Sequence, residues 1–594
     1  MVRNERGYTL VMVLLMIVII MILGTAIVSA SIGGATRTEK REDDVQSLHL
    51  AGKALNEAAA YLVSLYGDNT DIDPEELQLL MAQDQLDLLK DKLTTNTQLD
   101  DAAGKIVGIT AVQRNEYDFT SYIVTLTAEA NVKGTIRRLQ QEVIIQSYPE
   151  FLNYAFGSEN DVIINGSPYG IGSIYAGNKL LIDNQAQYIY KNSAEVRKKD
   201  TQYPHLEENG SVYVQSVDDI EYYDSLTSGY RPFLSAGSSK TITDLLGITN
   251  DQIVLRDKKK FVSINVEESF VDKAAEATHH ETSARNHIKQ AIDSRDYSEL
   301  SEVLQDFGVT KMPEPPEKPI LPEDLDDEAA MDEYYAAKAL YDDYLKRFEG
   351  ISETMLHDGS LTLDGIEYKT LEYTDHSKDV QGDWFIVNGD LNIINYNDSE
   401  PLKVKANILV TGNVTINGSI ILVDATIFAL GKTRVQDAQI RGLSGGVDRK
   451  QLILLSKGEI LVNRVDAFNN YGEYSSSKTN TLDAFFYTDD AAELYGVGSA
   501  FWLRGGFFAK GNLTINAVLG DASDDGTDII FDPLAQDMLD KLQSRFVIEY
   551  SNQFFEQQFS GLPRVKQLSV QVGSKQLLPY RSGLEGAKYN CQYK

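Results

Sequence analysis

The sequence predicts an α+β chain that is mainly β. A long N-terminal membrane or assembly helix comes first, then a small α/β region, then a parallel β-helix-like solenoid head with an α-helical insertion. Three observations predict this class. The 594 residues open with an apolar run from Tyr8 to Val28, a helical spacing of apolar residues follows that run, and short glycine-initiated strands recur in the second half of the chain.

The apolar run is longer than the core of a secretory signal, which has about 7 to 15 residues, although Val28-Ser29-Ala30 leaves weak cleavage after Ala30 as an alternative. About twenty apolar residues cross the hydrocarbon layer of a membrane as a helix. Basic side chains flank both ends of the run, so a count of positive charge does not set its orientation: Arg3, Arg6, Arg37, Lys40 and Arg41.

Helical spacing continues beyond the apolar run. Between Val45 and Tyr66, the apolar residues keep a three-to-four spacing that places one stripe against a partner surface: Leu48, Ala51, Leu55, Ala58, Leu62 and Tyr66. Gly67-Asp68-Asn69 is expected to end this helix. The same pattern would suit an ordinary amphipathic stem on any anchored ectodomain.

The segment Arg6-Gly7-Tyr8-Thr9-Leu10-Val11 resembles the start of type IV prepilins and type II secretion pseudopilins. The resemblance implies that a prepilin peptidase removes residues 1–7 between Gly7 and Tyr8, which leaves Tyr8 as a candidate for N-methylation. It also implies that residues 8–66, with Thr9, Leu10 and Met12, stay on the mature protein as a transmembrane and assembly helix. The membrane, the peptidase and other pilin-like subunits are the partners implied.

Met12 stands at the fifth mature position, where that family usually has a glutamate that pairs with the terminal amine of a neighbouring subunit. A chain without this carboxylate cannot offer the contact. Residues 33–62 also resemble the Gram-positive, PilX-type minor pilins. The resemblance therefore implies a non-catalytic minor subunit at the filament tip or in assembly or adhesion. It would sit in the bacterial cell membrane with one pass and its C-terminal domain outside, at the cell surface or on a pilus.

Residues 67–147 are expected to form a small helix and an antiparallel sheet. The helix covers residues 71–93, because Pro74 and the acids after it suit a helix start. From Ile106 to Ile145 the apolar residues alternate with polar ones, as in strands joined by turns.

The head is predicted from a repeat of Gly, Asn or Asp, an apolar residue, Asn or Thr, and Ile. It occurs at residues 389–393, 412–416 and 511–515, with a longer variant at 177–182. Stacked rungs of this kind predict a right-handed parallel β-helix at 148–192 and 360–532. A β-sandwich stays open because the rungs differ in length. Residues 193–359 read as a polar and helical insertion with a Pro-rich spacer, and 533–594 as an α/β cap on the open end.

Composition disfavours several kinds of chemistry. The net charge of −33 argues against nucleic acid as a partner of the head, because both carry negative charge. A surface or polysaccharide ligand is expected only from the adhesive role that the resemblance implies. Cys591 is the only cysteine and cannot form an internal disulfide. His279, His280 and His287 share one predicted helix without further metal ligands nearby, so a solvated helix face is favoured over a zinc site. Neither a nucleophile elbow nor a phosphate-binding loop is present, and no enzyme is expected.

Two alternative interpretations, a calcium site and a carbohydrate-active head, have candidate residues in the sequence. Oxygen-bearing side chains occupy ligand positions of a twelve-residue calcium loop, although a solvated acidic loop is favoured and no other cofactor is expected: Asp521, Ser523, Asp525 and Asp532, with Gly526 at the turn. A membrane-anchored polysaccharide-binding or polysaccharide-degrading β-helix is the rival function. Its candidate carboxylates are Asp383, Asp390 and Asp466.

Overall fold

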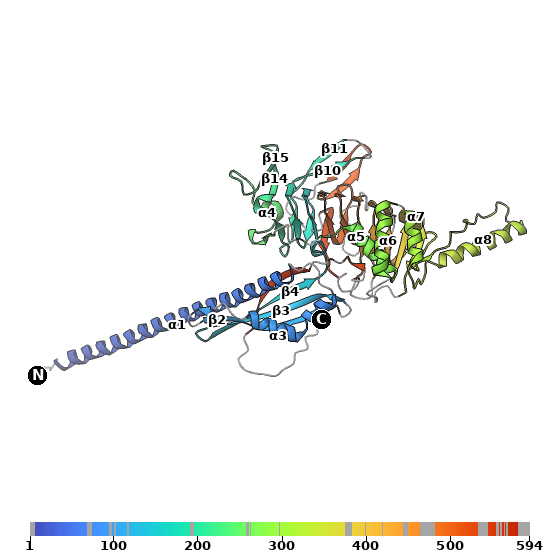
Figure 1. The fold of residues 1–594 in the computed structure, drawn as a ribbon. Coiled ribbons are helices and arrows are strands. Elements are labelled where there is room, and N and C mark those ends of the chain that lie inside the picture. Colours follow the sequence, from blue (N-terminus) through green and yellow to red (C-terminus); the bar gives the residue numbers. More distant parts are fainter. Residues whose placement is uncertain are drawn as a thin grey trace. The chain divides into compact units, whose positions relative to one another are not determined.

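The computed structural model describes most of the chain: residues 6–67, 74–93, 98–99, 102–115, 118–190, 195–256, 261, 263–295, 297–374, 383–397, 399–418, 420–443, 449–463, 481–532, 544–553, 558, 561–563, 565 and 568–579. The chain forms two compact units. Unit 1 joins Met1–Ser147 to Lys566–Lys594, and unit 2 is Tyr148–Val565. Figure 1 shows the elements of both units, coloured along the sequence.

Helix α1 (Arg6–Tyr66) is one unbroken helix of 61 residues (Figure 1). At 1.5 Å per residue its length is about 90 Å. The large apolar side chains from Leu10 to Ile32 are exposed, whereas Ala51, Leu55 and Leu62 in the second half are buried. The helix therefore has an exposed apolar half and a half that is packed on protein, and it ends at Tyr66 as its sequence predicts.

Unit 1 contains an antiparallel sheet in the order β1 (Gln98–Leu99), β2 (Ala102–Asn115), β3 (Asp118–Val132), β4 (Thr135–Gln146) and β37 (Ser569–Leu578). Every second residue of the central strand is buried against the second half of α1. The predicted antiparallel sheet is thus present, and the short strand β1 and the C-terminal strand β37 add to the strands expected between Ile106 and Ile145.

Small residues let α1 and the sheet approach closely. Ala51 and Ala58 lie in the buried seam of α1 with Val124 and Ala128 of β3. At Gly104 a Cβ atom would lie 2.7 Å from the carbonyl oxygen of Leu50, so a larger residue would push the helix away. Two short helices, α2 (Pro74–Leu80) and α3 (Gln83–Leu93), complete the same apolar core.

Strand β37 corrects the predicted C-terminal cap. It pairs with β4 in unit 1, with Gln146 opposite Ser569, and does not close the solenoid. The strand β36 (Phe546–Tyr550), also expected in the cap, pairs with strands on both sides inside the head. Alternating apolar residues predict a strand but not its partner. Unit 2 is consequently inserted between two adjacent antiparallel strands of unit 1.

Unit 2 is a parallel solenoid, as predicted. Its 11-stranded sheet pairs in parallel except at the β14–β15 hairpin. In order across the sheet its strands are β15 (Gly229–Pro232), β14 (Ile220–Asp224), β9 (Leu180–Asp183), β6 (Val162–Gly166), β33 (Leu513–Ala517), β31 (Ala492–Gly496), β29 (Ile460–Asn463), β26 (Thr433–Gln436), β24 (Val414–Gly418), β22 (Leu391–Asn395) and β19 (Leu361–Asp364).

The second solenoid sheet has 17 strands, and its pairings are also parallel. This pattern excludes the β-sandwich, whose sheets are antiparallel; the right hand of the coil stays a prediction. The strands in chain order are β5 (Phe156–Ser158), β7 (Tyr169–Ile171), β8 (Ile174–Ala176), β12 (His205–Leu206), β13 (Val212–Val214), β16 (Ile253–Leu255), β17 (Thr310–Lys311), β18 (Met355–Asp358), β20 (Thr370–Glu372), β21 (Trp384–Asn388), β23 (Leu402–Val410), β25 (Ile420–Ala429), β27 (Gln439–Gly442), β28 (Leu452–Ser456), β30 (Thr481–Thr488), β32 (Phe501–Ala509) and β36.

The rungs do not follow one another in chain order. Across the 11-stranded sheet the order runs from β19 to β33, continues with β6, β9 and β14, and ends with β15. The two chain segments meet where β33 pairs with β6, with Ile515 opposite Ile164. At this joint the buried Asn165 side chain donates a hydrogen bond of 3.0 Å to Asn516 Oδ1. Two distant parts of the sequence therefore build one solenoid.

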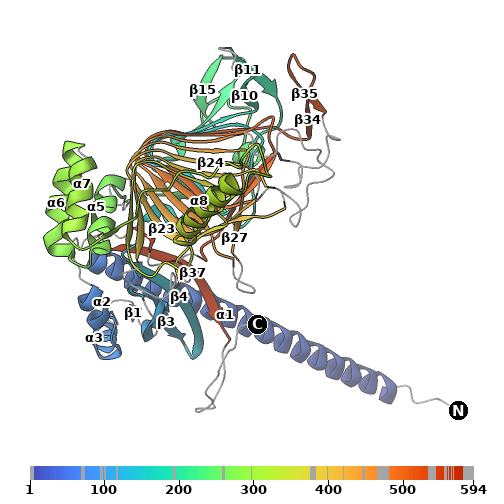
Figure 2. The ribbon, with the colours of Figure 1, turned by 90° about the vertical axis from the view of Figure 1, so that its right-hand side faces the viewer.

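The chain returns from one part to the other through α5 (Val266–Ala277), α6 (Glu281–Ser294) and α7 (Tyr297–Asp306), which pack on the outer face of the 17-stranded sheet (Figure 2). Strand β21 shows why both faces are apolar: Phe385 points into the solenoid core, whereas Ile386 packs under these helices. The predicted insertion at 193–359 is corrected accordingly, because β12, β13 and β14 belong to rungs.

The glycine of the repeat has a structural reason. The amide of Gly412 donates to the Gly389 carbonyl, and the Gly431 amide donates to Gly412, each over 2.9 Å. A Cβ atom on Gly412 would lie 2.7 Å from the Gly389 carbonyl group. Stacked turns at this spacing leave no room for a side chain, so the repeat marks the same turn of successive rungs.

Candidate functional site

The first half of α1 carries the predicted processing and assembly residues. Gly7 and Tyr8 lie on its first turns, but the side chains of Tyr8 and Thr9, and all of residues 1–5, are outside the described residues. Leu10 and Met12 are 70% and 59% exposed. The helix is long and apolar enough to cross a membrane.

The polar groups in the first half of α1 are also compatible with the hydrocarbon layer of a membrane. The sequence has no charged residue between Arg6 and Arg37. The Thr25 hydroxyl donates to the Met21 carbonyl over 2.5 Å, and the Thr36 hydroxyl donates to Ile32 over 2.9 Å. Hydroxyls bonded within their own helix need no water.

Ion pairs mark the level at which α1 begins to contact the sheet. Lys133 lies 3.5 Å from Glu39 and 3.6 Å from Asp43, and Arg137 lies 2.5 Å from Asp44. The two acids, Asp43 first, raise the pKa of Lys133. Just beyond them, the buried Ser47 hydroxyl donates to the Ala130 carbonyl over 3.0 Å. The charged residues thus separate the exposed apolar half of the helix from the half that is packed on protein.

The calcium candidates are not arranged as a calcium loop. Asp521 and Asp532 are opposite each other in a hairpin of β34 (Asp521–Asp524) and β35 (Ile529–Asp532), with Ser523 opposite Ile530. At the turn, Asp525 Oδ1 accepts hydrogen bonds from Thr527 and from the Asp528 amide. The candidate ligands therefore lie on two strands and their connecting turn, because residues 521–532 form a hairpin and not one continuous loop around an ion.

The other candidates also stay apart. His279 lies 3.6 Å from Asp383, while the His280 and His287 rings flank Phe307. Among the described residues no group of three or more histidine, cysteine or acidic side chains could hold a metal ion. Cys591 is outside the described residues.

Asp383 and Asp390, two of the three carboxylates of the rival function, are not paired with each other. Asp383 precedes strand β21 and Asp390 follows it, so a strand of five residues separates them. At about 3.3 Å per residue that strand alone spans roughly 16 Å, whereas a glycosidase pair lies within about 10 Å. Asp390 instead accepts a hydrogen bond of 2.7 Å from the Asn413 amide of the next rung. Asp466 is outside the described residues.

One concave site has no counterpart in the sequence prediction. A cleft of about 390 Å³ lies between residues 201–205 and α4 (Ile242–Leu246), and its lining includes Gln202, Tyr203 and His205. These residues belong to the segment read as a polar insertion. No periodicity marks them, and the single signal that could have pointed here is the aromatic and polar run Gln202-Tyr203-Pro204-His205.

Comparisons with known proteins give little beyond this geometry. No protein-family model matches the chain, and no curated protein matches it. One solved structure to which it is similar is the competence-associated pilin ComZ from Thermus thermophilus. That likeness covers 91% of this chain and 98% of ComZ at 13% identity, with a TM-score of 0.20. A TM-score this low gives no basis for transferring an activity or a partner.

Proposed function

We propose that this protein is a non-catalytic, pilin-like minor subunit of a type IV pilus or pseudopilus system, anchored in the bacterial cell membrane. The observation that carries the proposal is the division of α1. Its first half exposes an apolar surface from Leu10 to Ile32, and its second half is packed on an antiparallel sheet. The leader motif and the helix-on-sheet arrangement agree with the resemblance stated from the sequence.

In this proposal a prepilin peptidase cleaves between Gly7 and Tyr8 and the new N-terminus is methylated. The apolar residues of Leu10–Ile32 then span the membrane, since 23 helical residues extend about 35 Å against a hydrocarbon layer of about 30 Å. Other pilin-like subunits contact this half of the helix. Because Met12 offers no carboxylate, the subunit acts at a filament tip or in assembly, and its head is presented outside the cell for adhesion.

The test compares processing in the native host. In cells with the peptidase, wild-type protein is expected to lose residues 1–7, whereas Gly7→Ala protein keeps them. Gly24→Ala is the matched control, because a Cβ atom there meets nothing within 4 Å and no cleavage is expected at that position. Normal maturation of Gly7→Ala protein, or of wild-type protein in a peptidase deletion strain, contradicts the proposal.

A further inference from the structure

We propose that the cleft between residues 201–205 and α4 binds a neutral saccharide of one or two sugar rings. This inference rests on the adhesive role proposed above and names the ligand class for it. The cleft measures about 390 Å³ and opens to solvent at the part of the head where β12 and α4 lie. Sites for small ligands are usually concave, with volumes from about 300 to 1,000 Å³ and a few convergent polar groups.

The walls of the cleft are fixed by contacts behind them. The Ser167 hydroxyl accepts a hydrogen bond of 2.9 Å from the Gln202 amide and donates one of 2.7 Å to the Gln202 carbonyl, which holds this backbone on the solenoid. On the other side, Thr241 and Asp244 cap α4 reciprocally. The backbone on both sides is therefore set before a ligand arrives, which lowers the cost of binding.

His205 and Gly247 shape one end of the cleft. The His205 ring lies on Tyr169, with centroids 4.9 Å apart, and burial lowers the pKa of His205, so it is neutral near pH 7. Gly247 ends α4 with φ +73°, and a Cβ atom there would lie 2.3 Å from His205 Nδ1. Glycine is thus required both for the backbone turn and for the space beside the imidazole.

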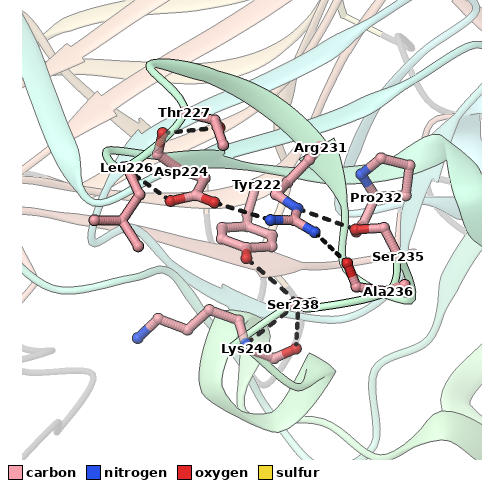
Figure 3. A network of polar contacts seen from close by, with 10 residues as sticks. All are labelled: Tyr222, Asp224, Leu226, Thr227, Arg231, Pro232, Ser235, Ala236, Ser238 and Lys240. Atoms are coloured by element: carbon pink, nitrogen blue, oxygen red, sulfur yellow. Dashed lines mark hydrogen bonds and ion pairs between the residues drawn. The ribbon is translucent and has the colours of Figure 1, made fainter.

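A network of polar contacts orders the loop that carries Lys240 and leads into α4. Figure 3 shows Arg231 joined to Asp224, Ser235 and Ala236, while Ser238 contacts Tyr222 and the backbone of Lys240. From that loop the Lys240 ammonium reaches 4.9 Å from the Tyr203 ring centroid. Lys240 therefore makes a cation–π contact with the aromatic ring of the cleft.

The polar groups that remain suit hydroxyl groups of a sugar. Within the described chain, neither the Gln202 side-chain amide nor the Tyr203 hydroxyl has a hydrogen-bond partner, although both side chains are half-buried. An amide offers donors and an acceptor, and a phenol offers one of each. These groups, next to an aromatic ring, can bond vicinal hydroxyls, which themselves both donate and accept.

The electrostatics favour a neutral sugar over an anionic one. After burial, the carboxylates of Asp183, Asp224 and Asp244 contribute to the raised pKa of Tyr203. Thr241 lowers the pKa of Asp244, so that carboxylate is charged at neutral pH. A uronic acid or a phosphate would be repelled by these carboxylates, and the contact between Lys240 and Tyr203 adds a single positive charge against them.

The experiment uses protein purified from the native host and placed in lipid nanodiscs, and binding is read by saturation-transfer NMR. The probes are the methyl glycosides of glucose, galactose and N-acetylglucosamine, the disaccharides maltose and cellobiose, and, as anions, glucuronate and inorganic phosphate. At least one neutral sugar is expected to bind in the micromolar to millimolar range. Loss of one hydrogen bond weakens that affinity about fivefold in Tyr203→Phe and in Gln202→Ala protein. Tyr335→Phe is the matched control, because Tyr335 is 59% exposed on α8 (Glu328–Lys346) and lines no part of the cleft.

The proposal is overturned if no neutral sugar binds, if only the anions bind, or if both cleft variants keep wild-type affinity. Each variant's melting temperature shows that it is folded. The N-terminus of the same preparation is determined by mass spectrometry. Cleavage after Gly7 without sugar binding contradicts the saccharide site alone. Sugar binding by protein that keeps residues 1–7 contradicts the pilin-like function alone.

Discussion

The joint between the two solenoid segments gives the sharpest prediction about the fold. Ile515 of β33 is fully buried, lies in the solenoid core and is opposite Ile164 of β6. Replacing a buried isoleucine by alanine costs about 2–5 kcal/mol. We expect Ile515→Ala to destabilise both strands. The two strands are distant in sequence, since Asn165 and Asn516, which form a hydrogen bond across the same joint, are 351 residues apart.

The magnitude sets the assay. A cost of about 3 kcal/mol raises the population of the locally opened state about a hundredfold, since each 1.4 kcal/mol is a factor of ten. Hydrogen–deuterium exchange read by mass spectrometry should therefore show faster exchange by about that factor in residues 513–517 and also in 162–166. Faster exchange at 513–517 with unchanged exchange at 162–166 would refute the joint.

Thr514→Ala is the matched control for this experiment. Thr514 is on the same strand and opposite Ile163, but its side chain faces outward and is only partly buried. Surface substitutions usually change stability by less than about 0.5 kcal/mol. Exchange in both strands should stay close to wild type, so that a loss of protection in Ile515→Ala reports the core contact.

Three further predictions concern the turn repeat, pH and calcium. Gly412→Ala should lower the melting temperature, because its Cβ would lie 2.7 Å from the Gly389 carbonyl group, whereas Gly34→Ala, with nothing within 4 Å, should not; equal melting of the two would contradict the stacked turns. Burial lowers the pKa of His357 in the folded protein. As the pH falls through about 6.5, the unfolded chain therefore takes up a proton before the folded one, and the free energy of unfolding decreases. In urea titrations between pH 7.5 and 5.5, His357→Asn protein should lose less stability than wild type, and an equal loss would contradict this cause. Addition of calcium should leave the melting curve unchanged. A shift in melting temperature that Asp525→Ala abolishes would contradict this prediction and support a calcium site.

Much of the head follows from its sequence because each rung repeats the same local requirement. Gly389 and Gly412 need the close turn, and the apolar residues after them alternate into the core. These are local conditions, so they predict that rungs exist and that they stack in parallel. They cannot predict which rung lies beside which. Ile164 and Ile515 occupy equivalent places in their strands, and either could pair with many others.

The sequence could predict neither the pairing partner of the C-terminal strand nor the cleft, and the physical reason is the same for both. The alternation in β37 predicts a strand, but only the free edge of β4 selects it for unit 1. Gln202 and Tyr203 form a site because α4 lies against them and because Gly247 leaves space beside His205. Both depend on contacts between residues distant in sequence. By contrast, the extent of α1 depends only on successive residues, and it was predicted to within two residues at its start.

The measurement that tests the proposed function most directly is the mass spectrum of the mature N-terminus from the native host. The account predicts that the chain begins at Tyr8, with a methyl group on its amine, and keeps the whole apolar half of α1. A chain that begins at Met1 or Val2, or one that is cut after Ala30, would contradict it.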